Sequence, residues 1–185
     1  RLINHGPTVL VTSAHQGRRD IMAAAWSMPV EFTPPRLALV IDKQTLTREL
    51  AIASGRLGLC VPGAALLDVT YAVGSVSGRD LDKFAAYGIE VCPPGRGTGA
   101  VPLVETGCAA WLDCRLIREP HTEEAYDTCF VEVLGAAADA RIFRDGHWRV
   151  GPDNAALHTL HHLGGGLFAV ADQARQARVP RSSGA

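Results

Sequence analysis

Two long runs of alternating side chains constrain the fold of this chain more than any other feature. They cover Cys108 to Ile117 and Tyr126 to Ala136, and the polar segment Glu119 to Glu124 connects them. Each run is long enough to cross the wall of a β-barrel, and two strands joined by so modest a loop pair antiparallel. The sequence therefore predicts a long antiparallel strand pair.

The first third of the chain predicts three strands of a meander, because apolar and β-branched runs alternate there with turn residues. These runs are Thr8–Ser13, Ile21–Trp26 and Arg36–Asp42. The tandem Pro34-Pro35 cannot lie in a central ladder, so it indicates a sheet edge or the start of a strand.

Short helices and further strands account for the rest. A threonine N-cap and Gly55 delimit a helix over Thr45–Ser54, and Ser77 begins a capping box ahead of a helix over Leu81–Tyr87. The other predicted elements are a strand over Leu57–Val61, a helix over Ala64–Val73, a hairpin over Arg141–Val150 and a final helix over Asp153–His162, ended by Gly164–Gly166. This order is not a regular alternation of strands and helices, so it predicts a mainly β antiparallel barrel with helical decoration.

Size and charge narrow the class of protein. A chain of 185 residues is expected to form one domain over 1–185, with a polar tail from about residue 173. With 18 basic and 19 acidic side chains, the net charge of −1 provides no basic field for nucleic acid. The longest apolar runs fall far short of the ~20 residues that span a bilayer.

The five cysteines form an odd set without a CxxC pair. A chain of this size can fold without disulfides, so we expect reduced, mostly buried thiols and a cytoplasmic protein.

Standard catalytic and cofactor motifs are absent or incomplete. The run Gly95–Gly99 follows two prolines rather than a strand and lacks the GxGxxG spacing, so it does not indicate a dinucleotide loop. Gly74–Gly78 has valine where a nucleophile elbow needs serine. His158 and His162 are four residues apart and could share a zinc ion on a helix, but no further ligand pair completes such a site.

Three separated segments would suit one phosphorylated aromatic ligand. The helix start Asp42–Arg48 combines backbone amides, hydroxyls and two cations, and Ser77–Lys83 provides a second helix start with a cation. The segment Asp20–Ser27 places small residues beside a tryptophan, where a flat ring could approach the backbone. Each segment alone is also typical of an ordinary capped helix or core strand.

These segments occur in the order typical of the flavin reductase-like, FMN-binding split-barrel proteins, and the chain resembles the flavoredoxin-like branch over nearly its whole length. The most specific mark is the string Ser-Gly-Arg-Asp-Leu-Asp-Lys-Phe at 77–84. Further matching segments are Thr8–Ser13, Met22–Trp26, Pro29–Pro35, Thr45–Gly55 and His161–Gly165.

The resemblance implies roles for individual residues. Asp20 and Trp26 would lie near the isoalloxazine and the ribityl chain of FMN. Thr47 and Lys83 match positions that hold the phosphate, and further candidate contacts are Ser77, Lys43, the loop residue His121 and the pocket-closing Phe168. Relatives commonly have asparagine in place of Asp20, and an ionised aspartate only accepts hydrogen bonds, so Asp20 would lower the flavin potential or bind ribityl hydroxyls.

The resemblance also implies an activity and an assembly. We expect an FMN-dependent oxidoreductase of the flavin reductase type that accepts a hydride from NAD(P)H, with His121 as the candidate polarising residue. The alternative is a flavoredoxin-like electron carrier that docks on a redox partner protein. In this family the pocket lies at a two-fold interface, which implies a homodimer; no metal is expected.

Overall fold

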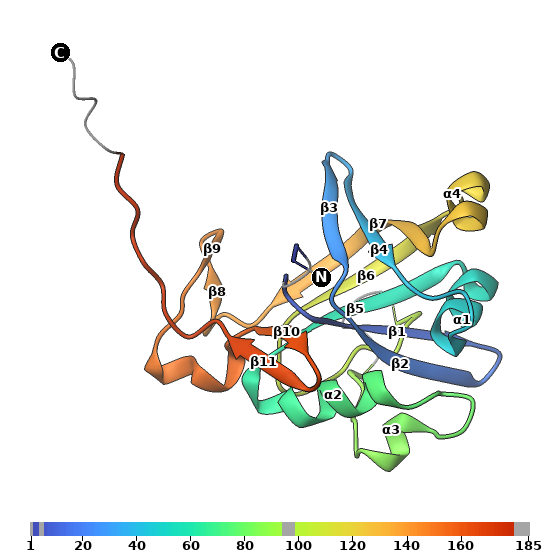
Figure 1. Ribbon diagram of the computed structural model, residues 1–185, viewed down its shortest axis with the longest axis horizontal. Helices are drawn as coiled ribbons and strands as arrows, with labels where there is room; N and C mark the ends of the chain where they lie inside the picture. The colour runs from blue at the N-terminus through green and yellow to red at the C-terminus, as the bar shows by residue number, and fades with distance from the viewer. Residues whose placement is uncertain (1, 4–5, 94–98, 180–185) are drawn as a thin grey trace.

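A seven-stranded antiparallel sheet dominates the fold in the computed structural model (Figure 1). The structure describes residues 2–3, 6–93 and 99–179, so the run 95–99 lies largely outside the described residues. The strand order is β2-β1-β5-β6-β7-β4-β3. The strands are β1 (Val9–His15), β2 (Arg18–Ala24), β3 (Ser27–Phe32), β4 (Pro35–Val40), β5 (Arg56–Pro62), β6 (Cys108–Ile117) and β7 (Thr128–Ala138).

The topology confirms the predicted long antiparallel pair and the mainly β fold. Strands β5, β6 and β7 follow one another as antiparallel neighbours, and β4 pairs with the outer side of β7. A long connection that contains helix α1 (Leu46–Ser54) therefore leads from β4 back to β5, which gives a Greek-key order. Strands β2 and β3 form the two edges of the sheet.

The β3–β4 hairpin differs from the predicted meander, which had no strand at β3. Pro29 and the exposed face of β3 hide its strand character in the sequence, and β3 forms because it pairs with β4. Pro34-Pro35 lies at the turn between these strands, at the edge of the sheet as predicted.

Helix α1 has the predicted caps. Thr45 Oγ1 accepts from the Arg48 amide, and Gly55 ends the helix with φ of 70°. Below the sheet lie α2 (Leu67–Ser75), α3 (Lys83–Ala86) and the short 3₁₀ turn Ala64–Leu66 (Figure 1).

Two predicted details of the helical segments are wrong. Asp82, not Ser77, caps α3, because its carboxylate accepts from the amides of Phe84 and Ala85. The connection Glu119–Glu124 is not a plain loop, because it contains most of α4 (Pro120–Ala125).

The predicted C-terminal helix over Asp153–His162 is also wrong. A 3₁₀ segment covers Pro152–Leu157, and the chain then forms a hairpin of β10 (Leu160–Gly164) and β11 (Leu167–Val170). Gly164 ends β10, and Gly165 and Gly166 make the turn of this hairpin; all three have positive φ, and they do not end a helix. His158 and His162 therefore do not share a helix face. The predicted hairpin over Arg141–Val150 is present as β8 (Phe143–Arg144) and β9 (His147–Trp148).

Apolar side chains pack on both faces of the sheet. One cluster lies beneath α1 and includes Val11, Leu39 and Val131; the other lies against α2 and α3 and includes Leu10, Ile21 and Phe84. Four of the five cysteines are buried, as predicted, and all five are reduced thiols. No helix among the described residues is both long and apolar enough to cross a bilayer.

Candidate functional site

A pocket of about 300 Å³ lies at the outer edge of β2. Asp20 and Met22 of β2 line it, and so does Lys83 at the start of α3. The other lining residues are 42 and 44–47, where the chain enters α1, and 73, 74 and 76–78, at the end of α2 and just after it. The three segments that suggested one ligand in the sequence therefore meet around one cavity.

Asp20 is the polar centre of this pocket wall. Its side chain is 3% exposed, and its two oxygens contact two different elements. Oδ2 accepts a hydrogen bond of 2.7 Å from Thr47 Oγ1, and Oδ1 lies 3.2 Å from Lys83 Nζ. Ser13 Oγ donates to the Thr47 carbonyl at 2.8 Å, which fixes the first turn of α1 against β1. A buried carboxylate needs such partners, because an unpaired charge in the interior is costly.

The Lys83 ammonium is fully engaged inside the protein. Besides Asp20, it donates to the Ile21 carbonyl at 2.6 Å and to the Val73 carbonyl at 3.1 Å. An ammonium has three N–H donors, so these three acceptors use all of them. Lys83 therefore ties α3 to β2 and α2, and it neutralises Asp20 rather than presenting its charge to the pocket.

Gly78 lets the chain pass directly over Asp20. A Cβ atom built on Gly78 would lie 2.1 Å from Asp20 Oδ1, a distance that no real side chain can adopt. Gly78 lies in the string 77–84, the most specific mark in the sequence. A glycine is required there because any side chain would collide with the Asp20 carboxylate.

The N-terminus of α1 supplies hydrogen-bond donors to the pocket. Leu46 and Thr47 begin the helix, and the first amides of a helix have no acceptor within it. Ser77 faces them from the other wall and is exposed, and its hydroxyl oxygen accepts from the Arg79 amide at 3.1 Å. Together these groups form a mouth suited to an anion.

The cations near this mouth are held in different ways. Lys43 does not line the pocket, because its ammonium donates to the Glu124 carbonyl at 2.6 Å. Arg48 is buried and donates to the Ile41 carbonyl at 2.6 Å. Arg79 is half exposed, lies 2.8 Å from Glu49 Oε2 and lines a shallow second depression beside the pocket, which shares Leu46 and Gly78 with it.

Arg79 belongs to the helix start Ser77–Lys83 that the sequence offered for a phosphate, although only Ser77 and Lys83 of that segment were named as individual contacts. The Arg79 guanidinium holds the pKa of Glu49 below its usual range.

The remaining predicted site residues lie apart from this pocket. Trp26 is 52% exposed at the turn into β3, and His121 is exposed on α4. Figure 1 shows α4 far from α2 and α3, at the other end of the molecule. Phe168 of β11 lies beside Tyr71 of α2, with ring centroids 6.4 Å apart, and lines a smaller neighbouring pocket. Within the described part of the chain, no three metal-ligating side chains gather in one place.

Comparison with known proteins assigns the chain to a family. The model of the flavin reductase like domain matches residues 3–152. The uncharacterized protein YddH of Escherichia coli K12 is 57% identical over 171 residues, which cover 91% of this chain and 88% of that protein.

Solved structures share the fold. A flavin reductases-like enzyme domain from Shewanella baltica, described as FMN-binding, is 41% identical with a TM-score of 0.86, and the match covers 96% of this chain and 92% of that one. The flavoredoxin of Desulfovibrio vulgaris has the same fold at 22% identity, with a TM-score of 0.76 over 97% of this chain and 93% of its own. The mainly β architecture is that of the FMN-binding split barrels. The chain belongs to the flavin reductase-like family.

Proposed function

We propose that this protein binds FMN along the outer edge of β2 and acts as an NAD(P)H-dependent flavin reductase. The observation that carries the proposal is the pocket in which the amino end of α1 and the segment 73–78 face each other across Asp20. Family membership and the FMN-binding relative from Shewanella baltica support the choice of ligand.

The residues present fit the phosphate end of FMN. The first amides of α1, at Leu46 and Thr47, and the Ser77 hydroxyl would donate to phosphate oxygens, and Arg79 at the mouth would add a guanidinium. Arg79 is available for this because its partner Glu49 is exposed and also contacts Arg18, which can retain the carboxylate. The side chains of Thr47 and Lys83 would act through Asp20 instead of touching the phosphate.

The residues further along the pocket fit a flat ring system. Gly74 has no side chain, and Met22 adds a flexible thioether to the lining of the pocket. The Asp20 carboxylate can accept from ribityl hydroxyls, and its charge is balanced by Lys83, which limits repulsion toward a reduced flavin. When bound, FMN supplies the hydride chemistry, and the protein orients it and sets its electrostatic surroundings.

We further propose that the protein works as a homodimer. Four large apolar side chains are exposed on and beside the edge strand β3, namely Trp26, Met28, Val30 and Phe32. An exposed apolar edge strand is unfavourable in a monomer, so a second copy is the simplest cover for it. In that assembly Trp26 and His121 could reach a flavin across the interface, although they lie outside the pocket of their own chain.

A flavoredoxin-like electron carrier is the second candidate. The open mouth beside Arg79 and the exposed apolar strand would then serve a redox partner protein. The two candidates share FMN binding and differ in their response to NAD(P)H.

One titration followed by one assay tests both. FMN binding is measured by flavin fluorescence, and NADH and NADPH oxidation are then followed with the FMN-loaded protein. Steady oxidation supports the reductase, whereas bound FMN with no oxidation favours the carrier. A protein that does not bind FMN would overturn both proposals.

The phosphate contacts are tested separately with riboflavin as the matched ligand. Arg79→Gln and Ser77→Ala should each weaken FMN binding by about tenfold and leave riboflavin binding unchanged, because riboflavin has no phosphate. Equal loss for both ligands would contradict the placement of the phosphate.

A further inference from the structure

Three of the five thiols gather in the apolar cluster that packs against α2 and α3. Cys60 of β5 and Cys108 of β6 are buried members of this cluster, and Cys92, in the segment that follows α3, packs against it. Cys114 and Cys129 lie in the other cluster, beneath α1. The grouping depends on the fold, because no two of the first three cysteines are near each other in sequence.

Cys60 and Cys108 are neighbours on adjacent strands. On the antiparallel pair of β5 and β6, Cys108 is opposite Pro62, two residues beyond Cys60, and a β-bulge shifts the register there. Side chains two residues apart on a strand face the same side, and the two thiols are joined by a hydrogen bond. The S–S bond of a disulfide is about 2.05 Å long, so two thiols that already touch need only a short further approach to form one.

Cys92 is linked to this pair through the backbone of Val104. The Cys92 thiol donates to the Val104 carbonyl at 3.6 Å, and the Val104 amide donates to Cys60 Sγ at 3.4 Å. The two sulfur atoms therefore contact the two polar backbone groups of one residue. The Cys92 amide also donates to the Leu103 carbonyl at 2.8 Å, which holds Cys92 beside the inner pair.

The three thiols differ in their access to solvent. Cys60 and Cys108 are 0% and 1% exposed, whereas Cys92 is partly exposed. The hydrogen bond to Cys60 and burial raise the pKa of Cys108 above its usual range, so this thiol keeps its proton. The attacking species in disulfide exchange is a thiolate that can reach the oxidant, so exchange begins at Cys92.

We propose that this cluster is a thiol–disulfide exchange site, in which Cys92 reacts with a low-molecular-weight disulfide and the inner pair, Cys60 and Cys108, ends as a buried disulfide. The inference rests on the contacts among the three thiols, and it does not require FMN.

The exchange proceeds in three steps when glutathione disulfide is the oxidant. The Cys92 thiolate attacks one sulfur of glutathione disulfide, which forms a mixed disulfide on Cys92 and releases the first glutathione. Cys60 then attacks Cys92 Sγ and releases the second glutathione, and Cys108 attacks Cys60 Sγ and returns Cys92 to a thiol. The inner pair loses two electrons and two protons, and one glutathione disulfide is reduced to two glutathione thiols.

The experiment maps the disulfides of the full chain after incubation with glutathione disulfide. Peptide mass spectrometry should find a Cys60–Cys108 disulfide in the parent protein and no retained glutathione. The result should be the same with and without saturating FMN. Formation of the disulfide in a protein that does not bind FMN would support this proposal while the function proposed above failed.

Three variants test the order of the steps. Cys60→Ala should stop after the first exchange and retain one glutathione on Cys92. Cys108→Ala should stop one step later, with a disulfide between Cys60 and Cys92. Cys92→Ser should slow the formation of the inner disulfide at least about tenfold, because the buried thiols then react only when the core opens.

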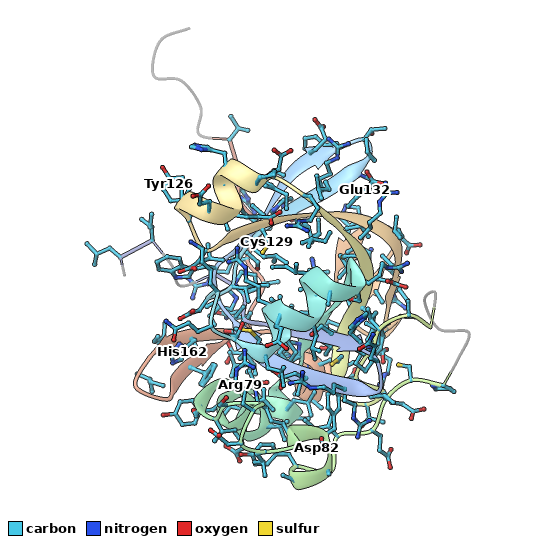
Figure 2. All side chains as sticks on the ribbon, turned by 90° about the vertical axis from the view of Figure 1, so that its right-hand side faces the viewer. Arg79, Asp82, Tyr126, Cys129, Glu132 and His162 are labelled. Carbon is cyan, nitrogen blue, oxygen red and sulfur yellow. The ribbon has the colours of Figure 1, made fainter. Side chains whose placement is uncertain are left out.

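Cys129→Ala is the matched control, since it removes a buried thiol from the other apolar cluster. Figure 2 shows Cys129 close to α4 and far from Asp82 at the start of α3. This variant should form the Cys60–Cys108 disulfide at the rate of the parent protein.

Three outcomes would overturn the proposal. One is a parent protein that keeps glutathione on Cys92 and forms no internal disulfide. The second is a disulfide that includes Cys114 or Cys129, and the third is a Cys92→Ser variant that is oxidised as fast as the parent. The mapping of the parent protein needs no substitution, so it decides the question even if an alanine variant fails to fold.

Discussion

The Lys83 ammonium lies 3.2 Å from Asp20 Oδ1, and each side chain is only 3% exposed. These two residues are 63 positions apart in sequence and come from α3 and β2. Their pairing means that the carboxylate in the pocket wall and its counter-ion form one unit. A change at either residue must therefore alter the pocket through the other.

Replacing Lys83 with methionine should destabilise the protein by about 3–5 kcal/mol, because Asp20 would be left buried without its counter-charge. The double variant Lys83→Met with Asp20→Asn should recover much of this loss, since neither remaining side chain is charged. Urea unfolding of the four proteins gives the coupling energy. If Lys83→Met weakened FMN binding and left unfolding unchanged, Lys83 would be a phosphate ligand instead.

Gly78→Ala should disturb the Asp20–Lys83 pair, because Gly78 lies directly against the Asp20 carboxylate. The added Cβ would meet Asp20 Oδ1 at 2.1 Å, so either the 76–78 segment or the carboxylate must move. We expect a loss of about 1–3 kcal/mol in the free energy of unfolding, together with weaker FMN binding.

Gly135→Ala is the matched control for this substitution. Gly135 lies in β7, its φ is not positive, and a Cβ there meets no atom within 4 Å. Thermal unfolding and FMN titration should distinguish the two alanine variants. Equal behaviour would show that the chain does not need the close approach over Asp20.

Local signals explain which parts of the fold were predictable. The caps of α1 are short-range features, since Thr45 and Gly55 act on residues within a few positions, and the strand β6 was predicted with its observed bounds. The edge strand β3 and the C-terminal hairpin depend on their pairing partners, and the hairpin also depends on the glycine turn after Gly164. The composition of such a turn also matches the end of a helix, so the sequence alone favours the wrong element.

The same reasoning applies to the candidate site. Ser77, Thr47 and Asp20 were placed in one site by resemblance, and they do line one pocket. The hydrogen-bond partners of the two lysines could not be predicted, because they lie far away in sequence. Lys83 donates to the Ile21 carbonyl, and Lys43 donates to the Glu124 carbonyl. A lysine at a helix start looks the same in sequence whether its ammonium faces a ligand or the protein interior.

The side-chain N-cap of α1 should contribute measurably to the free energy of unfolding. Thr45 Oγ1 accepts from the Arg48 amide at 3.3 Å and donates to the Asp42 carbonyl at 2.8 Å. Thr45→Ala should therefore lower the free energy of unfolding by about 1 kcal/mol, whereas Thr45→Ser should retain most of it. Urea denaturation of both variants checks this. Identical losses would indicate that the methyl group rather than the hydroxyl stabilises the helix.

The thiols should differ sharply in reactivity. Cys60, Cys108, Cys114 and Cys129 are at most 2% exposed, and Cys92 alone is partly exposed. Labelling of the native protein at pH 8 should therefore modify Cys92 quickly and the other four only after unfolding in urea. Mass spectrometry counts the labels, and Cys92→Ser should abolish the fast reaction. Rapid labelling of a second thiol would mean that one of the two core clusters opens in the native state.

Alkaline pH should destabilise the fold through these same thiols. Burial raises the pKa of Cys114 to about 12, and the Asp113 carboxylate acts in the same direction. An unfolded thiol ionises near ~8.5, so the unfolded chain loses its proton first. The contribution of Cys114 is therefore constant below pH ~8.5 and falls as pH rises from there toward about 12, at up to ~1.4 kcal/mol per pH unit. Burial also raises the pKa of Cys129, which makes the decline of stability with pH steeper.

Urea unfolding between pH 7 and pH 10 measures the decline, and Cys114→Ala should make it shallower even though the variant is less stable at neutral pH. A decline of the same steepness in that variant would assign the alkaline loss to other groups.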